Sequence, residues 1–474
     1  MFSKQNLILL SATVVLAVVI SFFNVNLPIY IFIGLMAFGV ISFFIFKNPI
    51  TGLYLITFFL PFERIGAYQL GGYTIRISQV LFIILLLVWL SRLIFQRKFD
   101  FAKNPLIIPL VIFLLINILS LQNAPNLERS LLVLAFIVFT ILLSLVIPNL
   151  LRGKKTIEKT ILILLVSAFL VSIFGIFQFL GDMAGLPTTI TGLRNLYTKE
   201  VLGFPRIQST AHEPLYFANY LLIPLSLAFS LFLSGRGKIK WGWLLILLIL
   251  GMINLVLTVS RGGYLALAVV ILIVSLIYFR KVFTLRNLII LAAVLIIVWL
   301  VVVRALGFGG EIFNLDIFKE HVANVFYGPS YQERIDTFEN AMTAWREHPI
   351  LGIGPGGFGP YMTPHPYYML KSWKIVNNEF IEILAENGIL GLLAFCLIIL
   401  VLLARSIKAV IKAQDKYLKA IMIALFAAFI GVIVQYQTFS TLYIMHVWFL
   451  VGLMVAVQNL VLANKNLTVK DNIS

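Results

Sequence analysis

Long apolar runs alternate with short polar segments along almost the whole chain. Each run is close to the roughly 20 residues that an α-helix needs to cross about 30 Å of hydrocarbon. The pattern predicts fourteen membrane spans, near residues 7-23, 27-46, 49-62, 79-95, 106-121, 129-148, 160-180, 214-233, 243-259, 264-279, 287-305, 378-404, 420-436 and 446-463. We therefore expect an all-α fold, a polytopic transmembrane helix bundle of about 12–14 spans, with a long extracytoplasmic loop containing short helices.

Composition strengthens this prediction. Hydrophobic residues make up 61% of the chain and charged residues 12%, with a mean hydropathy of +1.03, whereas soluble domains are about 45–50% apolar and about 25% charged. These values exclude a soluble enzyme and a disordered chain, and the lack of period-two alternation argues against a β-barrel. Cys396 is the single cysteine and lies in an apolar run, so we expect it to serve packing.

The basic residues predict an orientation. The formal net charge is +17, and 23 of the 36 Lys and Arg residues fall in one alternating set of connections. Such residues collect on the cytoplasmic side, which predicts cytoplasmic termini and outward-facing loops at 181-213 and 306-377. Residues 1-22 are interpreted as a retained first helix, since no small-residue cleavage site precedes Asn24. No basic segment is interleaved with aromatic residues, so we expect no nucleic-acid partner.

Familiar catalytic motifs are missing from the sequence. It contains no GxxxxGK[ST] phosphate loop, no HExxH motif, no cysteine pair for zinc and no GxSxG elbow. We therefore expect no metal and no cofactor. Energy would come from an ion gradient or from an already activated substrate.

An arginine lies between two predicted spans with almost no loop, in Ser260-Arg261-Gly262-Gly263. A cation at a membrane boundary is costly unless it snorkels to the surface or pairs with an anion. The glycines favour anion binding, because they let a ligand approach the backbone and leave the guanidinium available for a bidentate contact.

A second polar segment, residues 204-214, leads directly into a span. Pro214 suits the first turn of a helix, which would place His212 and Glu213 at the outward-facing N-terminus of that helix. Glu213 could serve only to complement the helix N-terminus. Arg206, together with Arg194 and Lys199, makes the loop a candidate anion-binding segment.

The long outer loop carries a helical pattern followed by a turn. Residues 334-345 have helical periodicity, with one apolar stripe formed by Ile335, Phe338, Met342 and Trp345. This pattern is also typical of an interfacial helix docked on the bundle. The glycine-rich segment 348-358 cannot be a helix interior.

Three carboxylates follow at the outer end of a span. Glu379, Glu382 and Glu386 share one helical face. Because acids facing lipid are costly, we expect them to face protein, a cavity or water.

Together these segments resemble the bacterial O-antigen ligase and polymerase family of polytopic membrane glycosyltransferases. The resemblance covers roughly residues 200 to 400 and rests on motifs in the family's order: Pro61-Phe62-Glu63-Arg64, Ser260-Arg261-Gly262, the 334-345 helix, the His348-Pro349-Ile350-Leu351-Gly352-Ile353-Gly354 turn and the helix from Glu379 to Gly391. The flanking spans match in hydropathy alone.

The resemblance implies transfer or polymerisation of glycans from an undecaprenyl-pyrophosphate-linked donor, at the outer face of the bacterial cytoplasmic membrane. It also implies an inverting, metal-independent reaction without a nucleotide sugar. Outer arginines would hold the pyrophosphate, a role that maps to Arg261 and, by extension, to Arg206 and Arg334. His212, Asn378 and Glu379 are further candidates for substrate contacts.

One position departs from the family pattern. The family helix usually opens with His-Asn, and that histidine is the favoured base, whereas this chain has Asn377-Asn378, so the resemblance makes Asn377 a catalytic candidate by position. An amide cannot accept the proton, so either the base has moved or the activity differs. Candidate bases are Glu213, His212, His365, His348 and Glu379; Glu213 is preferred because of Arg206 and Pro214, and His365 comes next because Thr363-Pro364-His365-Pro366 is a rigid loop.

The expected organisation has three parts: N-terminal helices (1-200), an O-antigen ligase-like core (201-404) that includes the outer loop 306-377, and C-terminal helices (405-474). Expected partners are the lipid-linked saccharide donor, a glycan or lipid acceptor and membrane lipids. The missing His-Asn pair slightly favours a polymerase or a divergent member of the family. A secondary transporter or flippase of lipid-linked or anionic solutes is the alternative, although the spans contain little charge and no evident two-fold repeat. A passive scaffold is a third possibility.

Overall fold

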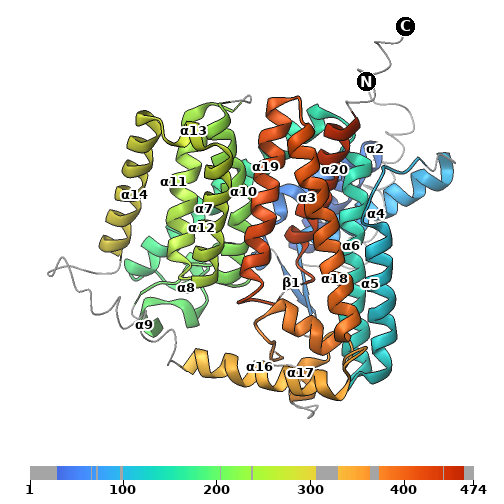
Figure 1. Cartoon of the computed structure of the whole chain (residues 1–474). Helices are drawn as coiled ribbons and strands as arrows, with labels where there is room; N and C mark the ends of the chain where they lie inside the picture. Colours follow the sequence, from blue (N-terminus) through green and yellow to red (C-terminus); the bar gives the residue numbers. More distant parts are fainter. Residues whose placement is uncertain are drawn as a thin grey trace, which may run out of the picture.

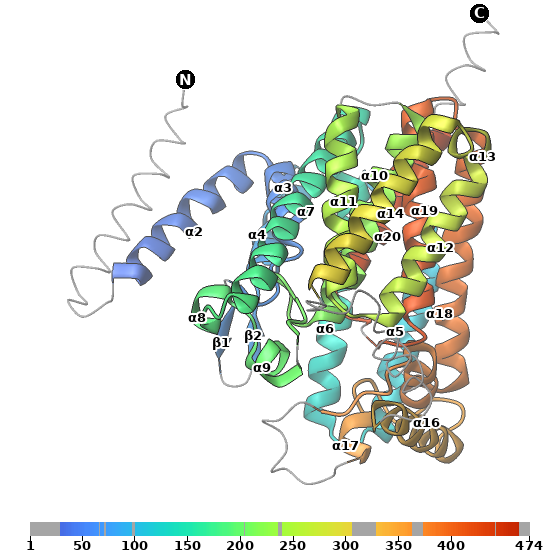
Figure 2. The ribbon, with the colours of Figure 1, turned by 90° about the vertical axis from the view of Figure 1, so that its left-hand side faces the viewer.

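The computed structural model of the chain describes residues 29–65, 67–70, 73–96, 100–202, 204–235, 239–305, 329–362, 373–440 and 442–463. Within them the fold is a bundle of long helices (Figures 1 and 2). Seven helices of these segments are long and apolar enough to cross a membrane. They are α4 (Ile77–Gln96), α6 (Leu127–Leu150), α7 (Lys154–Met183), α10 (Pro214–Ser234), α18 (Glu379–Lys412), α19 (Lys416–Gln435) and α20 (Met445–Ala463).

Shorter apolar helices complete the bundle: α2 (Ile29–Lys47), α3 (Pro49–Phe59), α5 (Ile107–Ser120), α11 (Trp241–Leu257), α12 (Arg261–Ile277) and α14 (Leu285–Ala305). Every predicted span from 27-46 onward overlaps one of these helices, and the first, 7-23, lies outside the described residues. The prediction of an all-α polytopic membrane bundle is confirmed.

Local sequence explains where several helices begin. Asn126 caps α6, because its side-chain oxygen accepts a hydrogen bond from the Arg129 N–H at 3.0 Å. Asp415 caps α19 in the same way, and Pro214 occupies the first turn of α10.

The centre of the bundle consists of α10, α19 and α20, whose side chains are mostly buried. Small polar residues bring α10 and α19 together: the Ser226 hydroxyl donates to the Ala424 carbonyl and the Ser230 hydroxyl to the Ala420 carbonyl, both at 2.7 Å. Such contacts satisfy polar groups inside an apolar bundle and let backbones approach closely.

Short elements collect at the end of the bundle where α16 lies, called here the α16 end (Figures 1 and 2). They are α8 (Thr188–Thr191), η2 (Asn195–Tyr197), α9 (Lys199–Leu202), α16 (Pro329–Glu347) and α17 (Phe358–Met362); a further 3-10 turn is η1 (Leu121–Asn123). The opposite end, with α13 (Phe279–Val282), is called the α13 end (Figure 1). A small antiparallel hairpin, β1 (Tyr68–Leu70) with β2 (Tyr73–Ile75), pairs Gln69 with Thr74. The pattern of apolar and polar residues did not predict this hairpin.

Helix α18 is broken at Gly388, whose φ of 64° and ψ of −169° are not helical. The 348–357 turn fills the break. The Ile353 and Gly354 N–H groups donate to the carbonyls of Ala385 and Glu386, while the Ile389 N–H donates to the Pro349 carbonyl at 3.0 Å. The turn therefore satisfies backbone groups that the break releases.

Helix α16 confirms the helix predicted at 334-345, but it docks by a different face than the apolar stripe indicates. Thr337, Ala341 and Ala344 are buried, whereas Phe338 of the stripe is 46% exposed. Small residues allow α16 to lie close to the first turns of α18, which leaves the larger apolar side chains at its margin.

Candidate functional site

Arg206 lies in the loop before α10 and is held by three contacts. Its Nε donates to the Thr258 carbonyl at 2.8 Å, its backbone N–H donates to the Tyr197 carbonyl at 2.8 Å, and its guanidinium carbon is 5.7 Å from the centre of the Tyr197 ring. Burial lowers the pKa of Arg206. The nearby Tyr197, Tyr264 and Glu213 oppose this shift, whereas Arg261 adds to it. Arg206 thus lies within electrostatic reach of both Glu213 and Arg261.

Arg261 is the first residue of α12 and is exposed at the α16 end. The Ser260 hydroxyl accepts a hydrogen bond from the Gly263 N–H at 3.2 Å and caps the helix. Arg334 of α16 belongs to the same neighbourhood, because its pKa is lowered by burial and then by the charge of Arg261. Arg261 thus lies within electrostatic reach of both Arg206 and Arg334, and these three residues from separate segments are called here the arginine cluster.

The glycines after Arg261 have a different role from the predicted one. A Cβ at Gly262 would lie 2.0 Å from the Thr438 hydroxyl oxygen, and one at Gly263 would lie 3.0 Å from the Ala218 Cβ. Protein atoms occupy the space expected for a ligand. The glycines allow α12 to pack against α10 and the 436–440 segment, so the prediction of ligand access at these two positions was wrong.

Glu213 lies beside the arginine cluster. Its backbone caps α10 without a side-chain cap hydrogen bond, and its carboxylate lies 3.6 Å from the Arg194 guanidinium. The Arg194 guanidinium is 5.7 Å from the centre of the Tyr197 ring, the same distance as that of Arg206. The carboxylate is therefore paired with Arg194 and provides no side-chain cap to α10.

His212 forms a second group with Glu63, Arg64, Arg76 and Arg194, the His212 cluster. Its pKa is lowered to about 4 by burial and then by Arg76, Arg194 and Arg64. The imidazole is consequently neutral near pH 7 and can accept a hydrogen bond. The Arg64 guanidinium donates to the Gly192 carbonyl, which ties the cluster to the loop before η2.

Glu63 is a buried member of this cluster that was not among the candidate site residues predicted from the sequence. It is 4% exposed and accepts a hydrogen bond from the His212 backbone N–H at 3.3 Å. Arg76 lies 4.0 Å from its carboxylate, and His446 Nδ1 lies 3.9 Å from it. Burial raises the pKa of Glu63, Arg76 and the His212 N–H oppose the rise, and Glu213 adds to it. Its occurrence in the Pro61-Phe62-Glu63-Arg64 motif was the available signal.

Asn377, Asn378 and Glu379 lie where α18 begins. Asn377 has a φ of 59°, and the Asn378 side chain caps the helix by accepting from the Phe380 and Ile381 N–H groups. Glu379 is 2% exposed, and its N–H donates to the Tyr436 carbonyl at 2.9 Å. These contacts hold the start of α18 against the segment after α19.

The three acids of α18 face protein, as predicted, and Glu386 has a structural partner. Its carboxylate accepts from the Gly356 N–H at 2.7 Å and the Phe358 N–H at 3.2 Å. The Glu382 carboxylate accepts from the Val376 N–H at 2.8 Å. Arg129 donates to the Gly356 carbonyl at 2.9 Å. These acids organise the turn and the start of α18.

The remaining candidates fall outside these two clusters. His365 lies outside the described residues. The His348 N–H continues α16 by donating to the Ala344 carbonyl, and the Lys199 ammonium donates to the Met183 carbonyl at 2.8 Å. Within the described segments, no group of three or more His, Cys, Asp or Glu residues is arranged to hold a metal ion.

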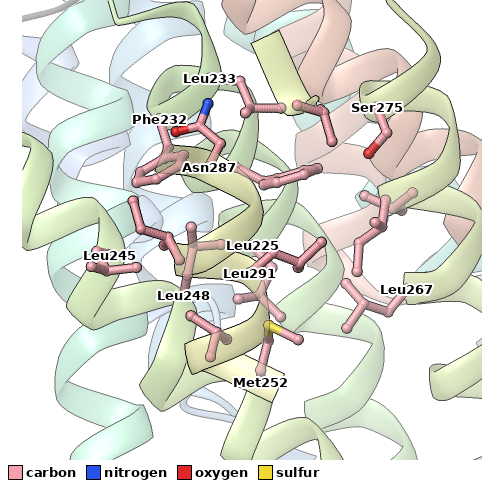
Figure 3. A pocket seen from close by; sticks show the side chains of 16 residues that line it. Leu225, Phe232, Leu233, Leu245, Leu248, Met252, Leu267, Ser275, Asn287 and Leu291 are labelled. Atoms are coloured by element: carbon pink, nitrogen blue, oxygen red, sulfur yellow. The ribbon is translucent and has the colours of Figure 1, made fainter. Parts of the chain in front are cut away.

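An apolar cavity of about 80 Å³ lies among α10, α11, α12 and α14 (Figure 3). Its lining is almost entirely leucine, isoleucine, valine and phenylalanine, with Ser275 and Asn287 as polar exceptions. None of the candidate site residues lines it. The cavity is suited to hydrocarbon and is separate from the arginine cluster.

Comparison with known proteins gives one family match. Residues 222–396 match the O-antigen ligase family. This match supports the resemblance of the chain to the O-antigen ligase and polymerase family. It supports glycan processing of the ligase or polymerase type, and the matched segment contains Arg261, Arg334 and the α18 acids, whereas Arg206, His212 and Glu213 precede it.

A relative in Haemophilus influenzae, an uncharacterised protein, is 27% identical over 229 residues. The alignment covers 44% of this chain and 55% of that protein. The chain thus matches about half the length of this relative. The name of the relative indicates no activity.

Proposed function

We propose that this protein is a membrane glycosyltransferase that transfers or polymerises glycans from an undecaprenyl-pyrophosphate-linked donor, with its site at the α16 end facing outward. The observation that carries the proposal is the arginine cluster. The Arg261 guanidinium at the start of α12 lies within electrostatic reach of Arg206 in the loop before α10 and of Arg334 in α16. Like charges gathered in this way repel, and a bound diphosphate would relieve the repulsion.

In the proposed reaction, the hydroxyl oxygen of the acceptor attacks the anomeric carbon of the donor sugar. The bond from that carbon to the pyrophosphate oxygen breaks, and the pyrophosphate leaves with the electron pair. The arginine cluster neutralises the growing charge, a form of preorganised stabilisation for which losing one donor costs about 10²–10³ in rate. Attack from the face opposite the leaving group inverts the anomeric centre.

Glu213 is the proposed base that receives the hydroxyl proton. Two observations favour it over Asn377, which occupies the position of the family histidine. Glu213 is 3.6 Å from Arg194 and within electrostatic reach of Arg206, and its side chain is 39% exposed, so an acceptor can approach it. His212, on the neighbouring position, would orient the acceptor as a neutral imidazole.

The proposal is tested with purified protein and an undecaprenyl-pyrophosphate-linked oligosaccharide, with and without a lipid A core acceptor. Longer glycans would identify a polymerase, and glycan joined to the acceptor would identify a ligase. Both outcomes should be lost in Arg261→Ala and kept in Arg280→Ala, which removes an exposed arginine at the α13 end. Substrate that crosses reconstituted vesicles without changing size would overturn the proposal in favour of a transporter.

A further inference from the structure

A large groove lies between α7 and α11, toward the α13 end of the bundle and apart from the arginine cluster. Its volume is about 820 Å³. Apolar side chains from α7 and α11 line most of it, and charged side chains line one end.

The apolar part of the groove has a buried floor and walls that are exposed on the surface of the bundle. Leu165, Leu244 and Leu247 on the floor are at most 5% exposed, whereas Val166 and Trp243 on the walls are 44% and 56% exposed. The Phe169 and Trp243 rings meet edge to face at 5.6 Å between centroids and link the two helices. A hydrocarbon chain can therefore lie in the groove while it remains in contact with the membrane.

The charged end is lined by Lys155 and Lys159 from α7 and by Lys240 from the start of α11, and the Lys159 ammonium also lies 4.6 Å from the centre of the Tyr54 ring. Glu158 also lines this end, so its formal charge is +2. Lys154 is paired with Asp415, which leaves this charge unchanged. Lys155 and Lys159 are one helical turn apart and continue directly into the apolar stripe of Leu162, Val166 and Phe169.

We propose that this groove is a binding site for an anionic phospholipid of the surrounding bilayer. The lysines would contact the phosphate, and one acyl chain would lie along the apolar floor. Basic pockets between membrane helices bind anionic headgroups, and Trp243 has the amphipathic side chain that is enriched at membrane interfaces. The proposal does not depend on the glycosyltransferase reaction.

The test measures lipid retention by native mass spectrometry of the purified chain in detergent, with added dioleoylphosphatidylglycerol. We expect Lys155→Gln/Lys159→Gln/Lys240→Gln to bind this lipid about 10- to 100-fold more weakly than the unchanged chain. The matched control is Lys103→Gln/Lys408→Gln/Lys412→Gln, which removes the same charge from exposed lysines outside the groove. An equal loss in this control would overturn the proposal, because it would show attraction to net charge alone.

Two further arms separate the phosphate from the lipid chain. Glycerol 3-phosphate should not displace the lipid, and dioleoylphosphatidylcholine should bind at least tenfold more weakly. Val166→Trp should fill the groove and lower retention with all lysines present, whereas Leu397→Trp on α18, 40% exposed, should leave it unchanged. Displacement by glycerol 3-phosphate, or full retention in Val166→Trp, would show that no chain occupies the groove.

Discussion

At the scale of single residues, Tyr197 joins the two charged groups of the α16 end. The guanidinium groups of Arg194 and Arg206 both lie 5.7 Å from the centre of its ring. Burial raises the pKa of Tyr197, and Glu213 adds to this rise, whereas Arg206 and Arg194 oppose it. The Tyr197 hydroxyl therefore stays protonated near pH 7 and can donate a hydrogen bond.

Glu213→Gln tests the proposed base while preserving side-chain size. Losing a general base typically costs about 10²–10⁴ in rate, so we expect turnover to fall by that range in the purified-protein assay. Donor binding should change less than tenfold, because the arginine cluster is intact. Glu339→Gln on the exposed surface of α16 is the control. Normal turnover in Glu213→Gln would assign the base elsewhere.

His212 should make the stability of the protein depend on pH. Its pKa in the folded chain is lowered to about 4 from an ordinary value of 6.5, so between these values the unfolded state binds a proton that the folded state does not. Stability should therefore fall as the pH is lowered from 6.5 to 4. Thermal unfolding in detergent should show a smaller decrease over this window in His212→Asn. An identical decrease in both proteins would mean that His212 does not carry the effect.

At the scale of elements, sequence periodicity predicted the spans, because a helix in hydrocarbon must be continuously apolar over a fixed length. The sequence also predicted that Pro214 lies at the start of a helix and that the long outer loop contains a helix, which is α16 in the structure. It did not predict the break at Gly388, since the turn that stabilises it comes from residues 349–354, far away in the sequence. Glu63 was missed for a related reason: its partner His212 is adjacent only in the folded chain.

The break in α18 should be sensitive to substitution of Gly352. Its φ is +69°, and an added Cβ would lie 2.4 Å from the backbone carbon of Glu386. We expect Gly352→Ala to destabilise the protein by more than the roughly 1–3 kcal/mol of backbone strain alone, measured as a lower thermal midpoint. Gly185→Ala, with a φ of +80° and no atom within 4 Å, isolates the strain. Equal midpoints for the two variants would show that the 348–357 turn adapts without cost.

At the scale of the whole molecule, the distribution of basic residues and the arrangement of the helices predict that the two ends of the bundle lie on opposite sides of the membrane. The α13 end should face the cytoplasm and the α16 end the outside. Single cysteines at exposed Thr284 and Glu339, in a Cys396→Ser background, test this orientation. A membrane-impermeant maleimide applied to intact spheroplasts should label Thr284→Cys at least tenfold less than Glu339→Cys. The reverse pattern would place the arginine cluster on the cytoplasmic side and contradict the proposed outward-facing site.

In the whole molecule, the apolar cavity and groove lie apart from the arginine cluster. The cavity of Figure 3 and the α7–α11 groove lie among membrane helices, whereas the arginine cluster lies at the loop-rich end. A lipid-linked diphosphate has this same division between hydrocarbon and charge.

The most direct measurement is the affinity of the purified protein for undecaprenyl pyrophosphate without sugar, because it isolates binding of the diphosphate from every later step. Charge-assisted hydrogen bonds contribute about 1.5–3 kcal/mol, so Arg261→Ala should weaken binding about 10- to 100-fold. Arg280→Ala should bind like the unchanged protein. Unchanged affinity in Arg261→Ala, or equal losses in both variants, would contradict the assignment of the arginine cluster as the diphosphate site.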